Sequence, residues 1–176
     1  MDEHEFRDFY ARTIEDVWRF ARRRCARADE ADDVTAETFA VAWRRRQEIP
    51  ADAARPWLFG VARLVLSNLQ RAHRRRQDLF VRLATVEEPR VHDAPAERDD
   101  AVWRSLAALT ESDRDLLLMR AWDELSVAEI ALVLDTTPAT VSSRLYKARQ
   151  RLAREIERRD PTPPGHVLDD PTVRRS

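Results

Sequence analysis

The sequence predicts an all-α protein, built from two small helical domains joined by a flexible linker. Glycine occurs at only two positions and alternating apolar and polar runs are scarce, so β-sheet is disfavoured. Apolar residues recur instead at steps of three and four, which is typical of amphipathic helices. Because proline-containing, aperiodic stretches interrupt this pattern, we expect domains at residues 1–80 and 101–159, a linker at 81–100 and a disordered tail at 160–176.

The first predicted helix spans residues 6–25 and has a wide apolar stripe. The stripe consists of Phe6, Phe9, Tyr10, Ile14, Val17, Trp18, Ala21 and Cys25. Arginines at 22–24 lie near its end, where cations complement the helix dipole. We expect this helix to have a mainly structural role.

The second predicted helix spans residues 31–46 and has acids at its start and arginines at its end. These charges stabilise the helix, because they are opposite in sign to the ends of the helix dipole. Asp33 and Glu37 lie four residues apart on one face, beside Ala36 and Ala40. Like charges at this spacing repel each other slightly. The pair is therefore either a site for a basic partner or an ordinary solvated face, and the periodicity alone favours neither.

The third predicted helix spans residues 56–76 and follows a loop at 47–55. Pro56 suits the first turn, because proline has no N–H to leave unpaired there. The apolar side of the helix consists of Leu58, Val61, Ala62, Val65, Leu66 and Leu69. Trp57 and Phe59 lie at one end and a run of arginines at the other, a combination that suits stacking on unpaired bases and binding of phosphates. The alternative role for the aromatic residues is core packing.

The C-terminal domain is predicted to begin with apolar residues in 101–109 and to continue through a second helix that Thr110 can cap. Two further helices follow in 126–152. Ser126 and Glu129 have the spacing of a capping box, and Thr137 with Pro138 suits the start of the last helix. That helix buries Val141, Leu145, Ala148 and Leu152 and exposes Ala139, Ser142, Ser143, Tyr146, Lys147 and Gln150. Two capped helices with a tight turn and a basic second helix favour DNA binding over an ordinary helical hairpin.

Charge is distributed unevenly along a chain whose net charge is −1. Residues 55–76 contain six arginines and no acid, and 136–159 contain seven basic residues against two acids. The intervening 80–115 contain nine acids against five arginines. Two basic segments separated by an acidic one predict two nucleic-acid-binding modules and a linker.

Several function classes lack support in the sequence. The four histidines are scattered, and no metalloprotease, phosphate-loop or serine-elbow motif occurs, so we predict neither an enzyme nor a cofactor. A single cysteine, Cys25, excludes an intramolecular disulfide. The acidic N-terminus and the lack of long apolar runs predict no signal peptide and no membrane insertion, and hence a cytoplasmic protein.

Three motifs in this order resemble bacterial sigma factors of the sigma-70 superfamily, in the small extracytoplasmic-function (ECF) subgroup. Residues 31–43 resemble region 2.2, with the sequence ADDVTAETFAVAW. Residues 56–68 resemble regions 2.3 to 2.4, with the sequence PWLFGVARLVLSN. Residues 109–149 resemble region 4. The resemblance covers most of the chain up to Leu152 and implies a non-catalytic subunit that directs RNA polymerase to promoters.

The resemblance also implies partners and site residues. Core RNA polymerase would be bound through its β′ clamp by Asp33, Ala36, Glu37, Phe39 and Ala40, and through its β flap by the C-terminal domain. The promoter −10 element would be opened and held, with a base flipped out, by Trp57, Arg63, Asn68, Arg71, Arg74, Arg75 and Arg76. The −35 element would be read by Thr140, Ser142, Ser143, Arg144, Tyr146 and Lys147. A dedicated anti-sigma factor is a further implied partner.

The chain departs from the family pattern at several of these positions. Ala36 replaces a frequent glutamine, Leu64 a common asparagine and Ser142 a frequent arginine. Asp135 and Ala139 replace glycines that are usual in the turn and at the start of the recognition helix. The resemblance therefore transfers the role of each helix but not the individual base contacts.

Two other interpretations are kept beside the sigma factor. One is a stand-alone helix-turn-helix regulator whose N-terminal helices dimerise or sense a ligand. The other is an enzyme or nuclease that uses the acid pairs. The order of an acidic helix followed by an aromatic and basic helix favours the sigma factor, and the absence of clustered acids and histidines in the sequence disfavours the enzyme.

Overall fold

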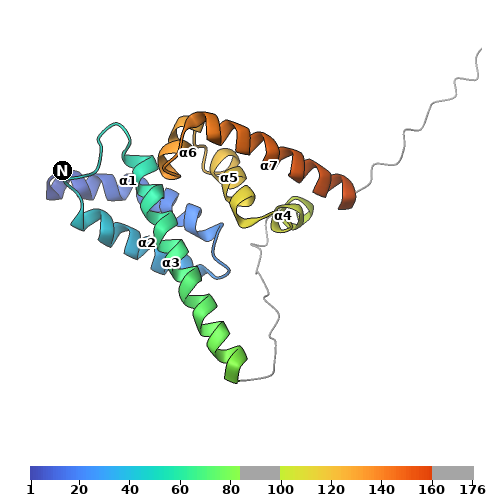
Figure 1. The fold of residues 1–176 in the computed structure, drawn as a ribbon. Helices are drawn as coiled ribbons and strands as arrows, with labels where there is room; N and C mark the ends of the chain where they lie inside the picture. The colour runs from blue at the N-terminus through green and yellow to red at the C-terminus, as the bar shows by residue number, and fades with distance from the viewer. Residues whose placement is uncertain (84–99, 160–176) are drawn as a thin grey trace, which may run out of the picture.

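The computed structural model describes residues 1–83 and 100–159, and these residues form seven α-helices and no strand (Figure 1). An all-helical fold is thereby confirmed. Most of the expected linker and the whole of the expected tail lie outside the described residues. The helices are α1 (Glu3–Arg22), α2 (Ala28–Arg44), α3 (Ala54–Leu83), α4 (Asp100–Ala107), α5 (Glu111–Ala121), α6 (Val127–Val133) and α7 (Pro138–Arg159).

The N-terminal three helices begin earlier than the apolar periodicity predicts. Helix α1 starts at Glu3 because Asp2 and Glu5 form a capping box, in which each side chain accepts from the other residue's backbone N–H. Helix α3 has Pro56 in its first turn and continues past the arginine run to Leu83. Residues 72–83 contain no glycine or proline, so nothing in the sequence ends the helix at Arg76.

The core of the N-terminal domain is centred on two aromatic rings from α1 and α3. Phe20 and Phe59 stack with ring centroids 4.8 Å apart and planes 11° apart, and both are buried. Arg24 lies over the outer face of Phe20, and Arg55 over that of Phe59. Phe59 is therefore a core residue rather than a surface for base stacking, whereas Trp57 is half-buried.

The C-terminal domain has the capped helix-turn-helix that the sequence predicts. Ser126 and Glu129 form the capping box of α6, and the Thr140 N–H donates to the Thr137 hydroxyl at 3.2 Å at the start of α7. Thr110 caps α5. In the turn between α6 and α7, Asp135 has a φ of 49°, in the left-handed region that aspartate tolerates better than most residues. This conformation explains why glycine is usual there and why the chain accepts Asp135 instead.

The two domains pack directly against each other, a contact that no sequence pattern predicted. Helix α6 lies against α3 in Figure 1, and a Cβ added to Gly60 would be 3.9 Å from the Val133 carbonyl oxygen. This is an ordinary contact distance, so there is room for a methyl group at this position. One continuous hydrophobic core includes residues from Phe6 in α1 to Ala148 in α7. In this structure the two domains therefore share an interface.

Candidate protein and nucleic-acid interfaces

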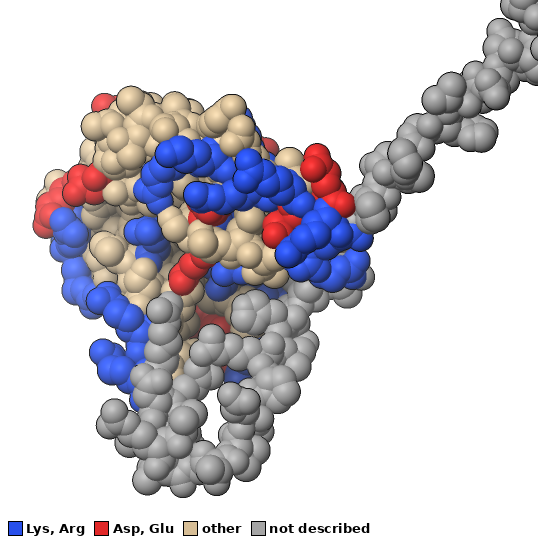
Figure 2. All heavy atoms as spheres, turned by 45° about the vertical axis from the view of Figure 1, so that its right-hand side comes forward, with Lys and Arg blue, Asp and Glu red and all other residues tan. Residues whose placement is uncertain are grey.

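Helix α7 presents a basic exposed face. Its inner face, formed by Val141, Leu145 and Ala148, is buried, whereas Ser142, Ser143, Tyr146, Lys147 and Gln150 are exposed. Tyr146 is 64% exposed, a large fraction for an aromatic residue without a partner molecule. Figure 2 shows the band of basic side chains that gathers on this side of the molecule. The exposed face combines positive charge with small polar residues at the helix start, which suits entry into a DNA major groove.

Two contacts hold α7 on α5. The buried Asp113 accepts from Arg151 Nη1 at 2.5 Å, and Arg144 Nη2 donates to the Ser112 hydroxyl at 2.5 Å. Arg144 is therefore half-buried and directed toward α5, unlike its exposed neighbours Ser143 and Lys147. The structure places five of the six residues predicted for −35 contacts on the exposed surface and turns Arg144 toward the protein.

Helix α3 has a second exposed strip. At 100° per residue, Trp57, Leu64, Asn68, Arg71 and Arg75 share one face. Arg71 donates to the Asn68 amide oxygen at 2.7 Å and to the Ser67 carbonyl at 3.2 Å, and Leu64 is 60% exposed. The side chains of Arg74 and Arg76, which were also predicted to contact the −10 element, lie outside the described residues.

Arg63 lies on a different face of α3 from the other predicted −10 residues. Its Nε donates to Asp115 of α5 at 3.1 Å. A residue assigned to promoter DNA is thus engaged by the C-terminal domain in this structure.

Helix α2 presents the acidic face. Asp33, Ala36 and Glu37 are exposed, and Ala40 is half-buried beside them. Glu37 has a basic neighbour on its own helix, since Arg44 donates to it at 3.1 Å. Phe39 was predicted to contact the polymerase, but its side chain is only 6% exposed. It packs edge-on against Tyr10, with ring centroids 4.6 Å apart.

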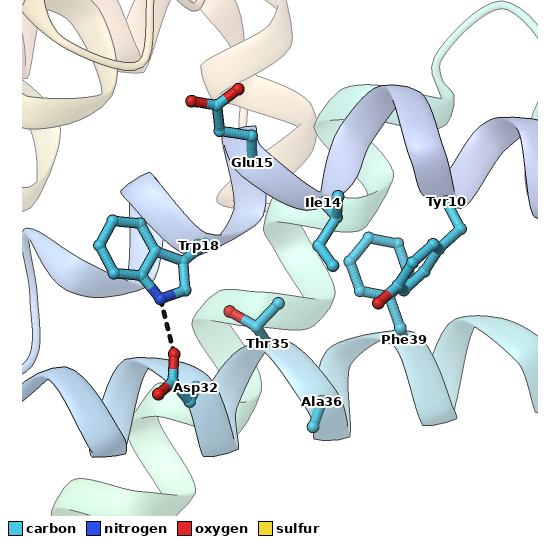
Figure 3. Close-up of a pocket in the computed structure, with 8 residues that line it drawn as sticks. All are labelled: Tyr10, Ile14, Glu15, Trp18, Asp32, Thr35, Ala36 and Phe39. Atoms are coloured by element: carbon cyan, nitrogen blue, oxygen red, sulfur yellow. Dashed lines mark hydrogen bonds between the residues drawn. The ribbon is translucent and has the colours of Figure 1, made fainter.

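An apolar groove of about 420 Å³ lies beside this acidic face, between α1 and α2 (Figure 3). Its lining residues are Tyr10, Ile14, Glu15, Trp18, Asp32, Thr35, Ala36 and Phe39. The Trp18 indole donates to Asp32 at 2.7 Å and so holds its ring at one end of the groove. The sequence analysis placed Tyr10, Ile14 and Trp18 in the apolar stripe of a helix with a mainly structural role. The width of the apolar stripe was the available signal, because a single helix face cannot bury all of the residues in it.

The described residues contain no group of three histidine, cysteine, aspartate or glutamate side chains that could hold a metal ion. No helix within residues 1–83 and 100–159 is long and apolar enough to cross a membrane.

The fold and these surfaces define a two-domain helical protein with a helix-turn-helix and an acidic face beside an apolar groove. Residues 9–76 match the family model described as sigma-70 region 2, and residues 99–152 match sigma-70, region 4. The chain belongs to the sigma-70 family and is an ECF RNA polymerase sigma factor, which directs transcription initiation through regions 2 and 4. As a sigma factor it is a non-enzymatic subunit of RNA polymerase.

Similar proteins span nearly the same length. The ECF sigma factor SigL of Mycobacterium tuberculosis (strain H37Rv) is 32% identical over 142 residues, which cover 77% of this chain and 80% of SigL. SigC of M. tuberculosis (strain CDC 1551) is 33% identical over 88% of this chain and 84% of SigC. SigM of Bacillus subtilis is 26% identical over 82% of this chain and 91% of SigM.

Solved structures share the fold. The sigma factor RpoE of Bartonella quintana, solved with the anti-sigma factor NepR, has a TM-score of 0.69 at 20% identity and covers 87% of this chain and 97% of its own. CnrH, solved with the cytosolic domain of CnrY, has a TM-score of 0.65 at 23% identity and covers 89% of this chain and 90% of its own.

Proposed function

We propose that the acidic face of α2 and the adjoining groove bind the β′ clamp of core RNA polymerase. The exposed carboxylates Asp33 and Glu37 attract basic side chains, and the groove offers apolar surface at the same place. A surface that combines a desolvated apolar centre with charges at its edge is typical of protein interfaces. Phe39 is 6% exposed and forms part of the groove lining, so it supports this surface mainly by packing. The single observation that supports the proposal best is this apolar groove directly beside unburied acids.

The promoter contacts are assigned to two helices. The strip of Trp57, Asn68, Arg71 and Arg75 on α3 binds the opened −10 element, with arginines on phosphates and the aromatic ring against bases. Leu64 adds an apolar contact within that strip. The exposed face of α7 enters the −35 major groove while the C-terminal domain docks on the β flap. Because RpoE was solved with the anti-sigma factor NepR, an anti-sigma factor is proposed for this chain too.

Reversing both acids with Asp33→Arg and Glu37→Arg is expected to weaken binding to purified core RNA polymerase at least tenfold, because like charges would then face each other. Binding is measured by fluorescence anisotropy, and circular dichroism checks the fold. The matched control is Asp8→Arg with Glu157→Arg, which changes the net charge equally at two exposed positions outside the groove. Equal affinity of both double variants and the parent would contradict the assignment, and absence of any association with core would contradict the whole proposal.

Replacing Lys147 by alanine is expected to weaken holoenzyme binding to a cognate promoter and to reduce the slope of log affinity against log salt by about 1. The physical reason is that one phosphate-neutralising charge is lost from the exposed face of α7. Arg120→Ala is the control, since it removes one exposed charge from the same domain but from α5. An unchanged affinity and slope for Lys147→Ala would mean that Lys147 contacts neither base nor phosphate.

A further inference from the structure

We propose that Ser112 and Asp113, at the start of α5, are positioning residues for promoter recognition. They determine how α7 is rotated about its axis, and therefore which of its side chains face the −35 element. Ser112 accepts from Arg144 Nη2 at 2.5 Å, and Asp113 accepts from Arg151 Nη1 at 2.5 Å. The inference rests on the proposed function of α7 and adds to it residues that specify the −35 sequence without touching DNA.

The two arginines that reach α5 lie on one flank of α7. Arg144 and Arg151 are seven residues apart, so their directions differ by only about 20° at 100° per residue. The same geometry places this flank about 80° from the centre of the buried face, which is formed by Val141, Leu145 and Ala148. The contacts with α5 therefore form the border between the buried and the exposed face of the helix.

Apolar packing alone leaves the rotation of α7 loosely specified. Hydrophobic burial is non-directional and depends on the area removed from water, so a small rotation about the helix axis changes it little. A hydrogen bond from a charged guanidinium, in contrast, requires a defined distance and angle between donor and acceptor. Two such bonds, two turns apart on the same flank, fix both the rotation of the helix and its position along its axis.

Asp113 is a rigid anchor for this contact. Its side chain is only 10% exposed, and its backbone N–H donates to the hydroxyl of Thr110, which caps α5. Breaking a buried ion pair leaves an uncompensated charge and is strongly unfavourable. Helix α7 is therefore restricted to orientations in which Arg151 reaches Asp113.

The rotation of α7 decides what its exposed face can read. A turn of about 20° would move the ends of the exposed side chains by about 2 Å, because a helix with its side chains has a radius of about 5–6 Å. Hydrogen bonds to base edges do not tolerate a shift of this size. Contacts from Ser143, Tyr146 and Lys147 therefore depend on the anchoring at α5. Arg144, which is half-buried, is held away from the same face.

The test measures promoter discrimination by the holoenzyme, as the ratio of its affinities for a cognate promoter and for a copy whose −35 element is scrambled. Asp113→Asn and Arg151→Ala each remove the ion pair and are each expected to lower this ratio about tenfold. The two changes combined are expected to lower it no further, because both remove the same contact. Arg151→Lys keeps the positive charge and is expected to retain most of the ratio.

Ser112→Ala tests the second contact by a different measurement. Without the hydroxyl, the Arg144 guanidinium is released from α5 and can turn toward a DNA phosphate. The slope of log affinity against log salt is then expected to steepen by about 1, for the cognate and the scrambled promoter alike. An unchanged slope would overturn the inference for Ser112.

Controls separate positioning from a loss of stability. Arg158→Ala removes an exposed arginine from the same helix, where it pairs with Glu155 instead of α5, and is expected to keep the discrimination of the parent. Thermal melting followed by circular dichroism checks that every variant is folded at the temperature of the binding assay.

The outcomes distinguish the inference from the function on which it rests. Unchanged discrimination in both Asp113→Asn and Arg151→Ala would overturn the inference, and so would a loss in Arg151→Lys as large as that in Arg151→Ala. A parent holoenzyme that binds both promoters equally would instead contradict the proposed −35 role of α7 itself.

Discussion

Replacing Phe59 by alanine is expected to lower the free energy of unfolding by about 3–5 kcal/mol, the largest stability effect that the structure predicts. Phe59 is 1% exposed and stacks on Phe20 at the junction of α1 and α3. The substitution removes apolar surface, leaves a cavity and deprives Arg55 of the ring beneath it. Since small proteins are stable by only about 5–15 kcal/mol, such a loss brings this chain close to unfolding. Urea denaturation followed by circular dichroism measures it.

Two further variants make the Phe59 result specific. Phe59→Leu keeps most of the apolar volume but loses the flat ring, so its cost is expected to be smaller by about 2 kcal/mol. Leu64→Ala, on the exposed strip of the same helix, is expected to change stability by less than about 0.5 kcal/mol. A loss below about 1 kcal/mol for Phe59→Ala would contradict the central position of the aromatic stack.

The native thiol of Cys25 is expected to react about 50-fold more slowly with a disulfide reagent at pH 8 than the same thiol in urea. Burial and, to a smaller extent, the Glu30 carboxylate raise the pKa of Cys25 to about 12, although the Arg22 and Arg24 guanidinium groups act to lower it. At pH 8 the native thiolate fraction is then about a thousandth of that of an unperturbed thiol, and the higher nucleophilicity of a basic thiolate recovers only part of this loss. Stopped-flow absorbance measures both rates.

The raised pKa of Cys25 also makes the stability of the folded protein depend on pH. The unfolded thiol ionises as the pH rises through its ordinary value of 9.0, whereas the native thiol stays protonated up to about 12. Stability is therefore lost above pH 9, by up to about 1.4 kcal/mol per pH unit, and is unaffected by this group below it. Cys25→Ala is expected to remove this part of the pH dependence. Equal reaction rates in native and unfolded protein would mean that the thiol is accessible.

Local features were predictable where neighbouring residues determine them. The caps at Ser126 and Thr137, and the division of α7 into a buried and an exposed face, follow from spacings of three and four residues. The helix ends were less predictable. Helix α3 passes Arg76 because helix propensity continues beyond the last residue of the apolar stripe.

The candidate sites were predictable in outline but not in every residue. Phe39 and Arg144 were expected at surfaces, and the structure turns them toward the protein interior or a neighbouring helix. For Phe59, base stacking and core packing were both open, and the structure buries it. Periodicity shows which side chains share a helix face. The neighbouring helices decide which of those side chains are buried. The groove between α1 and α2 was missed for the same reason, since it depends on how two helices are spaced.

Sequence patterns alone were enough to predict the helices, their order, their charged faces and the family. Helical periodicity, capping and charge order are local properties, and interactions within one or two turns decide them. Only the tertiary structure decided that region 4 lies on region 2, with Arg24 of α1 joined to Asp115 and Asp123. These residues lie about a hundred positions apart and match no local pattern. Their pairing depends on the close approach of α3 and α6 at Gly60, which brings the charges together and removes them from water.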